Sequence, residues 1–454
     1  MEVKVRPALS CRLVFGSGLL SPSFLLHKGR IIQMRISYFN GKIGLSPKKK
    51  EVPMSKDSIG RRDFMKSAAA GLGSFFLLSS NDPPKEPLLA LLRPDKKNYP
   101  QRTLGKTGIR LPVITMGVMN SNNPNLVRAA LDAGLVHLDT AQGYQRGTNE
   151  GMIGEVLKGR PRDSFVISTK LSLPRERTGL FKEDATEEAF LKKLDLSLQR
   201  LGLEYVDILH IHGLTKREAV LHEPLLKALE KAKKVGKTRF AGVSTHQNEP
   251  EVIHAAVDSR VYDVILTAYT FRQKHYAEVR GAIARAAQAG LGIIAMKTMG
   301  GNRTSYGVEQ VDARPSLKWV LQDPHVHTIV AGFTTFDQLE LDISIMADPA
   351  LTRIEKSQLQ KALSVAGLYC QGCGQCLGSC PQQLPIPELM RAYMYLYGYR
   401  NFTEAQDLVL SLDLPLKVCG DCETCPVACA SGFDVSGRIR DVVRLREVPL
   451  EFFA

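Results

Sequence analysis

Eight short apolar runs alternate with longer amphipathic segments between Tyr99 and about Pro349. The short runs are rich in β-branched residues, as strands are, and the longer segments have apolar residues at helical spacing and often end at a glycine. Eight such units in about 250 residues favour an α/β fold, a closed (β/α)8 (TIM) barrel, over an open doubly wound sheet. No G-x-G-x-x-G follows any of the runs, which weighs against a Rossmann domain. The predicted strands are ITMGVM, LVHLDT, FVISTK, VDILHIHG, TRFAGVST, VILTAYT, GIIAMKT and TIVAGFT.

Four polar residues stand where such a barrel carries its chemistry, at the C-terminal ends of the strands or in the loops just beyond. Asp139 follows the second run, Tyr144 lies in the next loop, Lys170 closes the third run and His212 closes the fourth. Each residue alone has an ordinary structural explanation, such as a helix cap or a solvated surface side chain. Their arrival at one rim of three successive strands instead predicts an active site. His210, two residues before His212 on the same strand face, is assigned to packing or support.

These four residue types suit the reduction of a carbonyl group. Hydride addition leaves charge on the oxygen, which a proton must neutralise as it develops. A phenol ordinarily titrates near ~10, so Tyr144 needs a neighbouring cation to release its proton at neutral pH. Lys170, held by Asp139, would be that cation, and His212 would orient the carbonyl or help to deliver the proton. A cofactor must supply the hydride, because no side chain can.

The barrel region resembles the aldo/keto reductase family over nearly its full length. QRTLGKTGIRLPVITMG resembles the family's opening hairpin and first strand, and LDTAQGYQRGTNEGMIGEVLKG resembles its Asp and Tyr segment. VISTK and YVDILHIHG resemble its lysine and histidine strands. The resemblance implies a catalytic tetrad of Asp139, Tyr144, Lys170 and His212, a nicotinamide cofactor, and a small carbonyl or alcohol substrate.

The nicotinamide contacts implied by this resemblance match the family less well. Thr245 replaces an expected Asn and Leu266 an expected Gln. Family members that choose the phosphorylated cofactor place a Lys and an Arg near the eighth strand, where this chain has Gly332 and Gln338. A phosphate without cations is poorly held, so NAD or NADP stays open. The implied cofactor-binding residues are Ser244, Tyr269, Gly332, Thr334 and Gln338.

Eight of the nine cysteines form two quartets near the C-terminus, and only Cys11 lies outside them. Both quartets read C-x2-C-x2-C-x3-C, the bacterial ferredoxin run, in which the fourth cysteine ligates the other cluster. Structural zinc usually takes two cysteine pairs with a longer gap, and disulfides suit short secreted chains without a large core. The spacing favours two [4Fe-4S] clusters, with zinc or disulfides as the alternatives.

Resemblance to two-cluster ferredoxins implies a crosswise set of ligands. Helical segments such as TEAQDLVLSL between the quartets indicate a small, mainly helical ferredoxin-type domain after the barrel. The closing barrel segment SLKWVLQDPHVHTIVAGFTTFDQLELDI likewise resembles aldo/keto reductases with a cysteine-rich tail. One cluster would be held by Cys370, Cys373, Cys376 and Cys429, and the other by Cys419, Cys422, Cys425 and Cys380.

A basic leader precedes the barrel. Arg61 and Arg62 come before Phe64, Lys66 and a weakly apolar run over 67–80, which is short for a membrane span and suits a signal. The pattern resembles a twin-arginine export signal, with an ordinary amphipathic helix as the alternative. That route exports folded proteins, as a cluster-bearing protein requires, so we expect a periplasmic location rather than a cytoplasmic one. No membrane span is expected beyond an uncleaved signal.

The net charge of +14 does not indicate nucleic-acid binding. Residues 1–66 contain fourteen Lys or Arg and four Asp or Glu, so the leader carries +10 and the remainder only 14 − 10 = +4. Nucleic-acid binding would need a basic face on the folded domain.

These observations predict a carbonyl oxidoreductase whose partners are a small substrate and a redox protein. A barrel without hydride chemistry, acting as an electron-transfer or binding module, is the alternative. We expect residues 1–53 to be a disordered upstream extension, with Met54 as the natural start. The expected segments after it are a signal at 54–80, a linker at 81–98, the barrel at 99–350, a connecting helix at 351–369 and the ferredoxin-type domain at 370–454.

Overall fold

The computed structural model describes residues 99–301, 313–364, 367–420, 422 and 424–453, and the backbone of three strands between 23 and 47. The chain divides into two compact units, Met1–Lys85 and Glu86–Ala454. The predicted signal at 54–80, the linker at 81–98 and Cys11 lie outside the described residues.

The first unit contains a three-stranded antiparallel sheet where we expected disorder. Its strands are β1 (Ser23–His27), β2 (Arg30–Phe39) and β3 (Lys42–Pro47), in that order. The isoleucines and aromatic residues of β2 favour a pleated strand. The expectation overlooked this propensity because it treated residues 1–53 as an extension upstream of a natural start at Met54.

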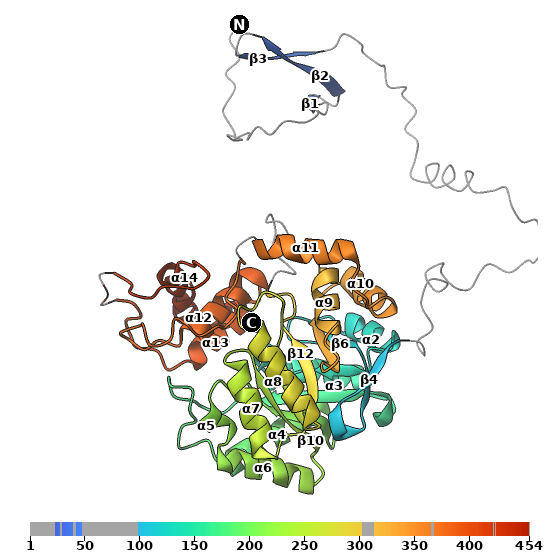
Figure 1. Ribbon diagram of the computed structural model, residues 1–454, viewed down its shortest axis with the longest axis vertical. Coiled ribbons are helices and arrows are strands. Elements are labelled where there is room, and N and C mark those ends of the chain that lie inside the picture. The colour runs from blue at the N-terminus through green and yellow to red at the C-terminus, as the bar shows by residue number, and fades with distance from the viewer. Residues whose placement is uncertain are drawn as a thin grey trace, which may run out of the picture. The chain divides into compact units, whose positions relative to one another are not determined.

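The second unit contains the predicted barrel (Figure 1). Its eight parallel strands close in the order β10-β11-β12-β13-β6-β7-β8-β9, and each coincides with one of the eight predicted runs. The prediction of a (β/α)8 fold is therefore confirmed. The strands are β6 (Ile114–Gly117), β7 (His137–Asp139), β8 (Val166–Leu171), β9 (Val206–Ile211), β10 (Thr238–Thr245), β11 (Val264–Ala268), β12 (Gly292–Met296) and β13 (Thr328–Gly332).

A helix follows each strand. In α4, for example, Thr186 caps the N-terminus by accepting the Ala189 N–H, and Gly202 ends the helix in the left-handed conformation. Its buried face, which includes Phe190 and Leu194, packs in the main core. The barrel helices are α2 (Pro124–Asp132), α3 (Thr148–Leu157), α4 (Glu187–Leu201), α6 (Glu223–Lys234), α7 (Glu249–Ser259), α8 (Tyr276–Gln288), α9 (Ala313–Leu321) and α10 (Phe336–Ala347), with a short α5 (Arg217–Val220) before α6.

A hairpin of β4 (Gln101–Thr103) and β5 (Arg110–Pro112) contributes to a second core inside the barrel. Leu104 and Leu111 of this hairpin pack with Ile208, Leu266 and Ile294 of the strands, and all five are fully buried. Leu266 is therefore a packing residue of the barrel interior, which explains why an apolar side chain stands there.

A helical segment follows the barrel and has its own apolar core. Leu389, Ala405 and Val442 belong to this core, and all three are fully buried. We call residues 367–453 the cap. Helix α11 (Arg353–Ser364) precedes it, and its elements are α12 (Ile386–Tyr393), the π-helix η6 (Met394–Gly398), α13 (Phe402–Ser411), α14 (Val435–Val443), η7 (Arg444–Glu447) and η8 (Leu450–Phe453).

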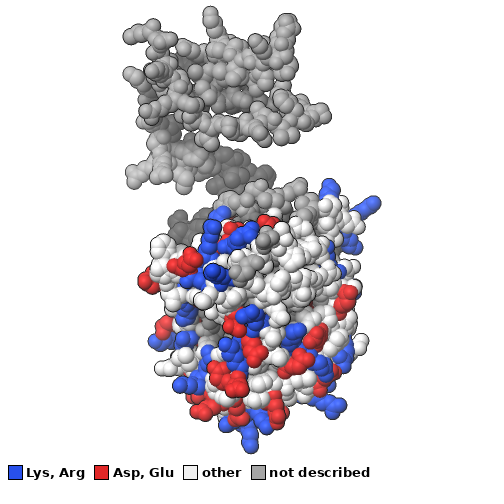
Figure 2. Space-filling model, turned by 90° about the vertical axis from the view of Figure 1, so that its left-hand side faces the viewer, with Lys and Arg blue, Asp and Glu red and all other residues white. Residues whose placement is uncertain are grey.

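The surface has mixed charge. On the face that Figure 2 shows, acidic and basic side chains lie interspersed over the folded body. Within the described residues, no helix combines the length and apolar character that a bilayer crossing needs.

Two glycines of α3 allow a matched test of helix packing. A Cβ at Gly154 would lie 2.7 Å from the Arg200 carbonyl oxygen, whereas a Cβ at Gly151 would have no atom within 4 Å. We expect Gly154→Ala to destabilise the protein by about 1–3 kcal/mol through overpacking against α4. Gly151→Ala should instead stabilise α3 by about 0.5–1 kcal/mol, because alanine loses less backbone entropy in a helix. Urea unfolding midpoints measure both effects, and equal shifts in the two variants would contradict this packing.

Candidate active site

The four predicted catalytic residues meet at one end of the barrel. Asp139 is the last residue of β7, Lys170 lies near the end of β8, and His212 directly follows β9. Tyr144 opens the short 3-10 segment η4 (Tyr144–Gly147) in the loop after β7. Parallel strands place their C-terminal ends together, so three segments far apart in the sequence supply one site.

Lys170 connects these residues. Its ammonium group donates to Asp139 Oδ2 at 2.6 Å, to the Thr140 carbonyl at 2.6 Å and to the Tyr144 hydroxyl at 3.2 Å. Three acceptors satisfy the three N–H groups of a lysine, so its charge is fixed in place although the side chain is only 1 % exposed. The Tyr144 and His212 rings meet edge to face, with their centroids 6.0 Å apart.

A second row of polar side chains supports Asp139 from inside the barrel. Ser168 Oγ donates to Asp139 Oδ1 at 2.7 Å and lies 2.9 Å from His137 Nε2. The Nδ1 atom of His137 lies 3.2 Å from Thr115 Oγ1. The sequence contained a signal for this row, because His137 and Ser168 precede Asp139 and Lys170 by two positions and so share their strand faces. His210 is fully buried and packs against Gly242, where a Cβ would lie 2.3 Å from the imidazole, which agrees with a supporting role.

Burial dominates the protonation of the site. It raises the pKa of Tyr144 well above 10, and the negative charge of Asp139 raises it further. We expected Lys170 to make proton loss from Tyr144 easier, but burial and Asp139 outweigh it. Burial likewise lowers the pKa of Lys170, although Asp139 opposes this shift. Burial, followed by the charge of Lys170, lowers the pKa of His212 well below 6.5, so the imidazole is neutral at neutral pH.

A cavity of about 730 Å³ opens beside Tyr144 and Asp139. This volume lies in the range of small-molecule and cofactor sites. Residues of the barrel and of the cap share its wall, and two cations, Lys297 and Arg400, are among them. The lining residues from the cap are Tyr399, Arg400, Asn401, Phe402 and Thr403.

Three of the five predicted nicotinamide positions line this cavity: Gly332, Thr334 and Gln338. The Gln338 side chain accepts the Thr334 N–H at 2.9 Å, which orders the loop after β13. Gly332 and Gln338 stand where the resemblance led us to look for cations, and the fold brings Lys297 and Arg400 to the same cavity from other segments. Cations suit the phosphates of a dinucleotide, so the residues present fit such a cofactor.

The other two predicted positions have different surroundings. Ser244 Oγ accepts the Gly213 N–H at 2.8 Å. The Tyr269 hydroxyl donates to Asp323 at 3.1 Å, and its ring centroid lies 5.0 Å from that of Trp319. Neither residue is among the described ones that line the cavity.

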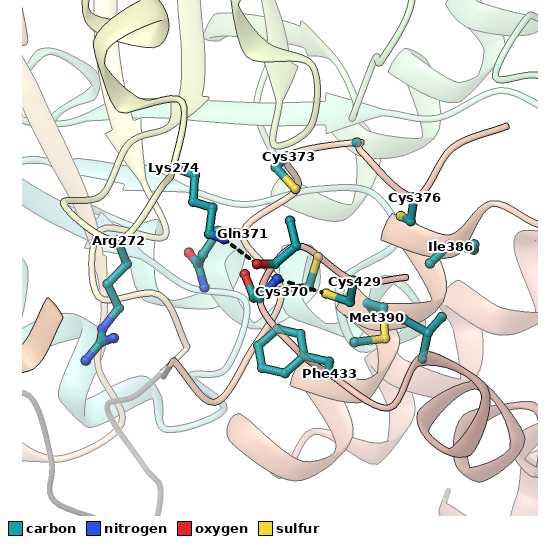
Figure 3. Close-up of a pocket in the computed structure, with 14 residues that line it drawn as sticks. Arg272, Lys274, Cys370, Gln371, Cys373, Cys376, Ile386, Met390, Cys429 and Phe433 are labelled. Atoms are coloured by element: carbon teal, nitrogen blue, oxygen red, sulfur yellow. Dashed lines mark hydrogen bonds between the residues drawn. The ribbon is translucent and has the colours of Figure 1, made fainter. Parts of the chain in front are cut away.

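The cysteines group crosswise in space. Cys370, Cys373 and Cys376 of the first quartet and Cys429 of the second line one pocket, beside the apolar side chain of Phe433 (Figure 3). The eight cysteines of the two quartets, Cys370, Cys373, Cys376, Cys380, Cys419, Cys422, Cys425 and Cys429, are free thiols.

The remaining four cysteines form a second group. Burial raises the pKa of the Cys419 thiol, and the neighbouring thiols of Cys380, Cys425 and Cys422 raise it further. Among the described residues, no three His, Cys, Asp or Glu side chains lie close enough to hold a single metal ion. Each thiolate of a [4Fe-4S] cluster binds a different iron, so cluster ligands lie farther apart than the ligands of one ion.

No sequence pattern indicated the cap residues at the barrel mouth. Glu404 of α13 accepts the Gln145 N–H at 2.8 Å, next to Tyr144. Lys297, after β12, donates to the Tyr395 hydroxyl at 3.1 Å. Neither contact follows from spacing, because 259 positions separate the first pair and 98 the second.

Comparison with known proteins agrees with the architecture. Residues 116–315 match the model of the aldo/keto reductase family. L-galactose dehydrogenase of Arabidopsis thaliana is 33% identical over 159 residues, which are 32% of this chain and 47% of that protein. L-glyceraldehyde 3-phosphate reductase of Escherichia coli (strain K12) is 31% identical over 173 residues, 35% of this chain and 49% of that protein. The chain thus spans about half the length of these two relatives.

An uncharacterized oxidoreductase of Bacillus subtilis (strain 168) is 24% identical over 309 residues, 57% of this chain and 95% of that protein. Among solved structures, the holo form of an aldo-keto reductase from Bacillus halodurans aligns over 61% of this chain and 99% of its own, with 23% identity and a TM-score of 0.48. Residues 116–315 of the barrel are thus similar to the aldo/keto reductase family.

Proposed function

We propose that the chain is a nicotinamide-dependent oxidoreductase that interconverts a carbonyl compound and its alcohol. The observation that carries this proposal is the position of the Lys170 ammonium group, which bonds both the Asp139 carboxylate and the Tyr144 hydroxyl beside a large cavity. A buried phenol held by a fixed cation is the arrangement that protonation of a carbonyl oxygen requires.

In the reduction, Tyr144 acts as the general acid. A nicotinamide cofactor, which Lys297 and Arg400 of the cavity wall would help to hold, would supply the hydride for the carbonyl carbon. The phenol donates its proton to the carbonyl oxygen, which completes the alcohol. The raised pKa keeps Tyr144 protonated before the reaction, and Lys170 stabilises the phenolate that remains. Asp139 holds Lys170 in place, and the neutral His212 orients the carbonyl oxygen. A proton from solvent then restores Tyr144.

Removal of one oxygen atom tests this mechanism. We expect Tyr144→Phe to lower kcat for aldehyde reduction by about 10²–10⁴-fold, because the general acid is lost. Reduction is measured as the loss of NADH or NADPH absorbance with a panel of aldehydes, including L-glyceraldehyde 3-phosphate. Oxidation of L-galactose is measured as the gain of absorbance with NAD or NADP. Tyr262→Phe is the matched control, since this buried hydroxyl donates to the Val220 carbonyl at 2.9 Å and is not among the described residues lining the cavity.

Equal activity in the Tyr144→Phe variant and the wild type would contradict the mechanism. A wild-type protein that oxidises neither nucleotide with any carbonyl, yet contains clusters, would favour the electron-transfer or binding module instead.

We also propose that the cap holds two [4Fe-4S] clusters. The crosswise grouping supports this, because free thiols from both quartets face the pocket that Figure 3 shows. Cys370 lines this pocket and also a second one with His246 and Lys297 at the barrel mouth, so the first cluster would lie near the site where hydride is exchanged. This placement supports electron exchange between the clusters and the nicotinamide, and through them with a redox partner protein.

Single cysteine substitutions separate the two clusters. We expect Cys429→Ser to remove the cluster of the first quartet and Cys422→Ser the other, so each variant should lose about half of the iron and sulfide. Iron and sulfide analysis after anaerobic purification gives the measurement, with Cys11→Ser as the control that loses none. Zinc in place of iron, or loss of both clusters from every variant, would contradict the assignment.

We further propose export by the twin-arginine route, with the nucleotide bound before export and retained. This rests on the sequence of the leader, since export of folded protein is what bound clusters require. Arg61→Lys with Arg62→Lys should retain the protein in the cytoplasm, measured by cell fractionation. Cytoplasmic wild-type protein would refute export and leave the reductase proposal intact.

A further inference from the structure

The turn that carries Tyr144 has an unfavourable backbone conformation. Gln145 and Arg146, the two residues after Tyr144, adopt left-handed conformations with φ of 50° and 55°. Residues other than glycine disfavour this region, because their Cβ atom approaches the backbone. Contacts from elsewhere must therefore hold the turn.

Helix α13 of the cap supplies those contacts. The Glu404 carboxylate accepts the Gln145 N–H at 2.8 Å. The Arg146 guanidinium donates to Asp407 at 3.1 Å and to Gln406 at 2.7 Å, and also to the Leu450 carbonyl at 2.7 Å. Both left-handed residues are thus bound by one helix, three residues of which share the task.

Helix α13 is itself anchored at its N-terminus and in its middle. At its start, Asn401 accepts the Glu404 N–H at 3.1 Å and donates to Asn120 of the barrel at 2.9 Å. Further along, the fully buried Gln406 donates to the Leu445 and Val448 carbonyls at 2.9 and 2.7 Å. The helix therefore forms a firm support for the turn.

We propose that α13 positions Tyr144 for catalysis and that Glu404 is the principal positioning residue. The reaction at the barrel mouth then depends on the cap, whether or not the cap also transfers electrons. This inference rests on the proposed reductase function, but the hydrogen bond to Gln145 can be tested without it.

The charge of Glu404 adds a pH dependence. Burial raises its pKa to about 7, Asp407 acts in the same direction, and the Gln145 N–H, Lys297 and Lys170 oppose the shift. Arg146 also lies close, bound to Asp407. Above pH 7 the ionised carboxylate disfavours negative charge on Tyr144, whose pKa it raises. Reduction should therefore slow as the pH rises through about 7.

Two substitutions in the full-length protein separate position from charge. Glu404→Ala removes both, and we expect kcat to fall by about tenfold with KM changed less than about twofold, because misplacement of Tyr144 affects the reacting geometry. Glu404→Gln keeps an oxygen that accepts the Gln145 N–H, so kcat at pH 6 should remain within about twofold of the wild type. The loss of rate near pH 7 should be absent from the Gln variant.

Hydrogen exchange reports on the turn without any substrate. The Gln145 amide should be protected in the wild type and in Glu404→Gln, and should exchange at least about tenfold faster in Glu404→Ala. Glu230→Ala is the control, since this glutamate is exposed on α6. Thermal unfolding establishes that each variant is folded. If Glu404→Ala does not fold, the pH profile of Glu404→Gln still tests the proposal.

Wild-type kcat and unchanged Gln145 exchange in Glu404→Ala would overturn the proposal. A pH profile of Glu404→Gln identical to that of the wild type would overturn the role of charge. If the wild type shows no Tyr144-dependent reduction, the reductase function fails, whereas the exchange measurement still decides whether α13 holds the turn.

Discussion

The bond between the Lys170 ammonium and the Asp139 carboxylate is the interaction on which the site depends. Both side chains are nearly inaccessible, and removing one partner of such a pair leaves an uncompensated buried charge at a cost of about 3–5 kcal/mol. Burial alone would raise the pKa of Asp139, but the charge and hydrogen bond of Lys170, together with His210 and His137, outweigh burial and lower the pKa. The Ser168 hydroxyl and the Thr140 carbonyl satisfy the remaining groups of the pair, so the charge that faces Tyr144 is fixed before any substrate arrives.

The cap contacts the barrel next to this charge. Its residues wall the cavity, and Glu404 holds the turn behind Tyr144. The same segment carries both cysteine groups. The chain thus places both cysteine groups and the cavity beside Tyr144 within one compact unit, Glu86–Ala454.

The barrel and its tetrad were predictable because their signals are local. Each strand shows its apolar run, and the rule that parallel strands share an end places Asp139, Lys170 and His212 together. Resemblance to two-cluster ferredoxins implied that Cys429 groups with Cys370, and the two residues line one pocket. Two expectations from local residues were incomplete. Burial and Asp139 raise the pKa of Tyr144 although Lys170 bonds its hydroxyl, and Tyr269 bonds Asp323 and packs on Trp319.

The sequence by itself thus determined the closed barrel and the rim at which Asp139, Lys170 and His212 meet. Only the tertiary structure decided that a cap lies over that rim, that Lys297 and Arg400 supply cations to the cavity, and that Glu404 supports Tyr144 from 259 positions away. The physical reason is that periodicity and spacing act over a few residues, whereas burial, charge balance and a strained turn depend on atoms that only folding brings together.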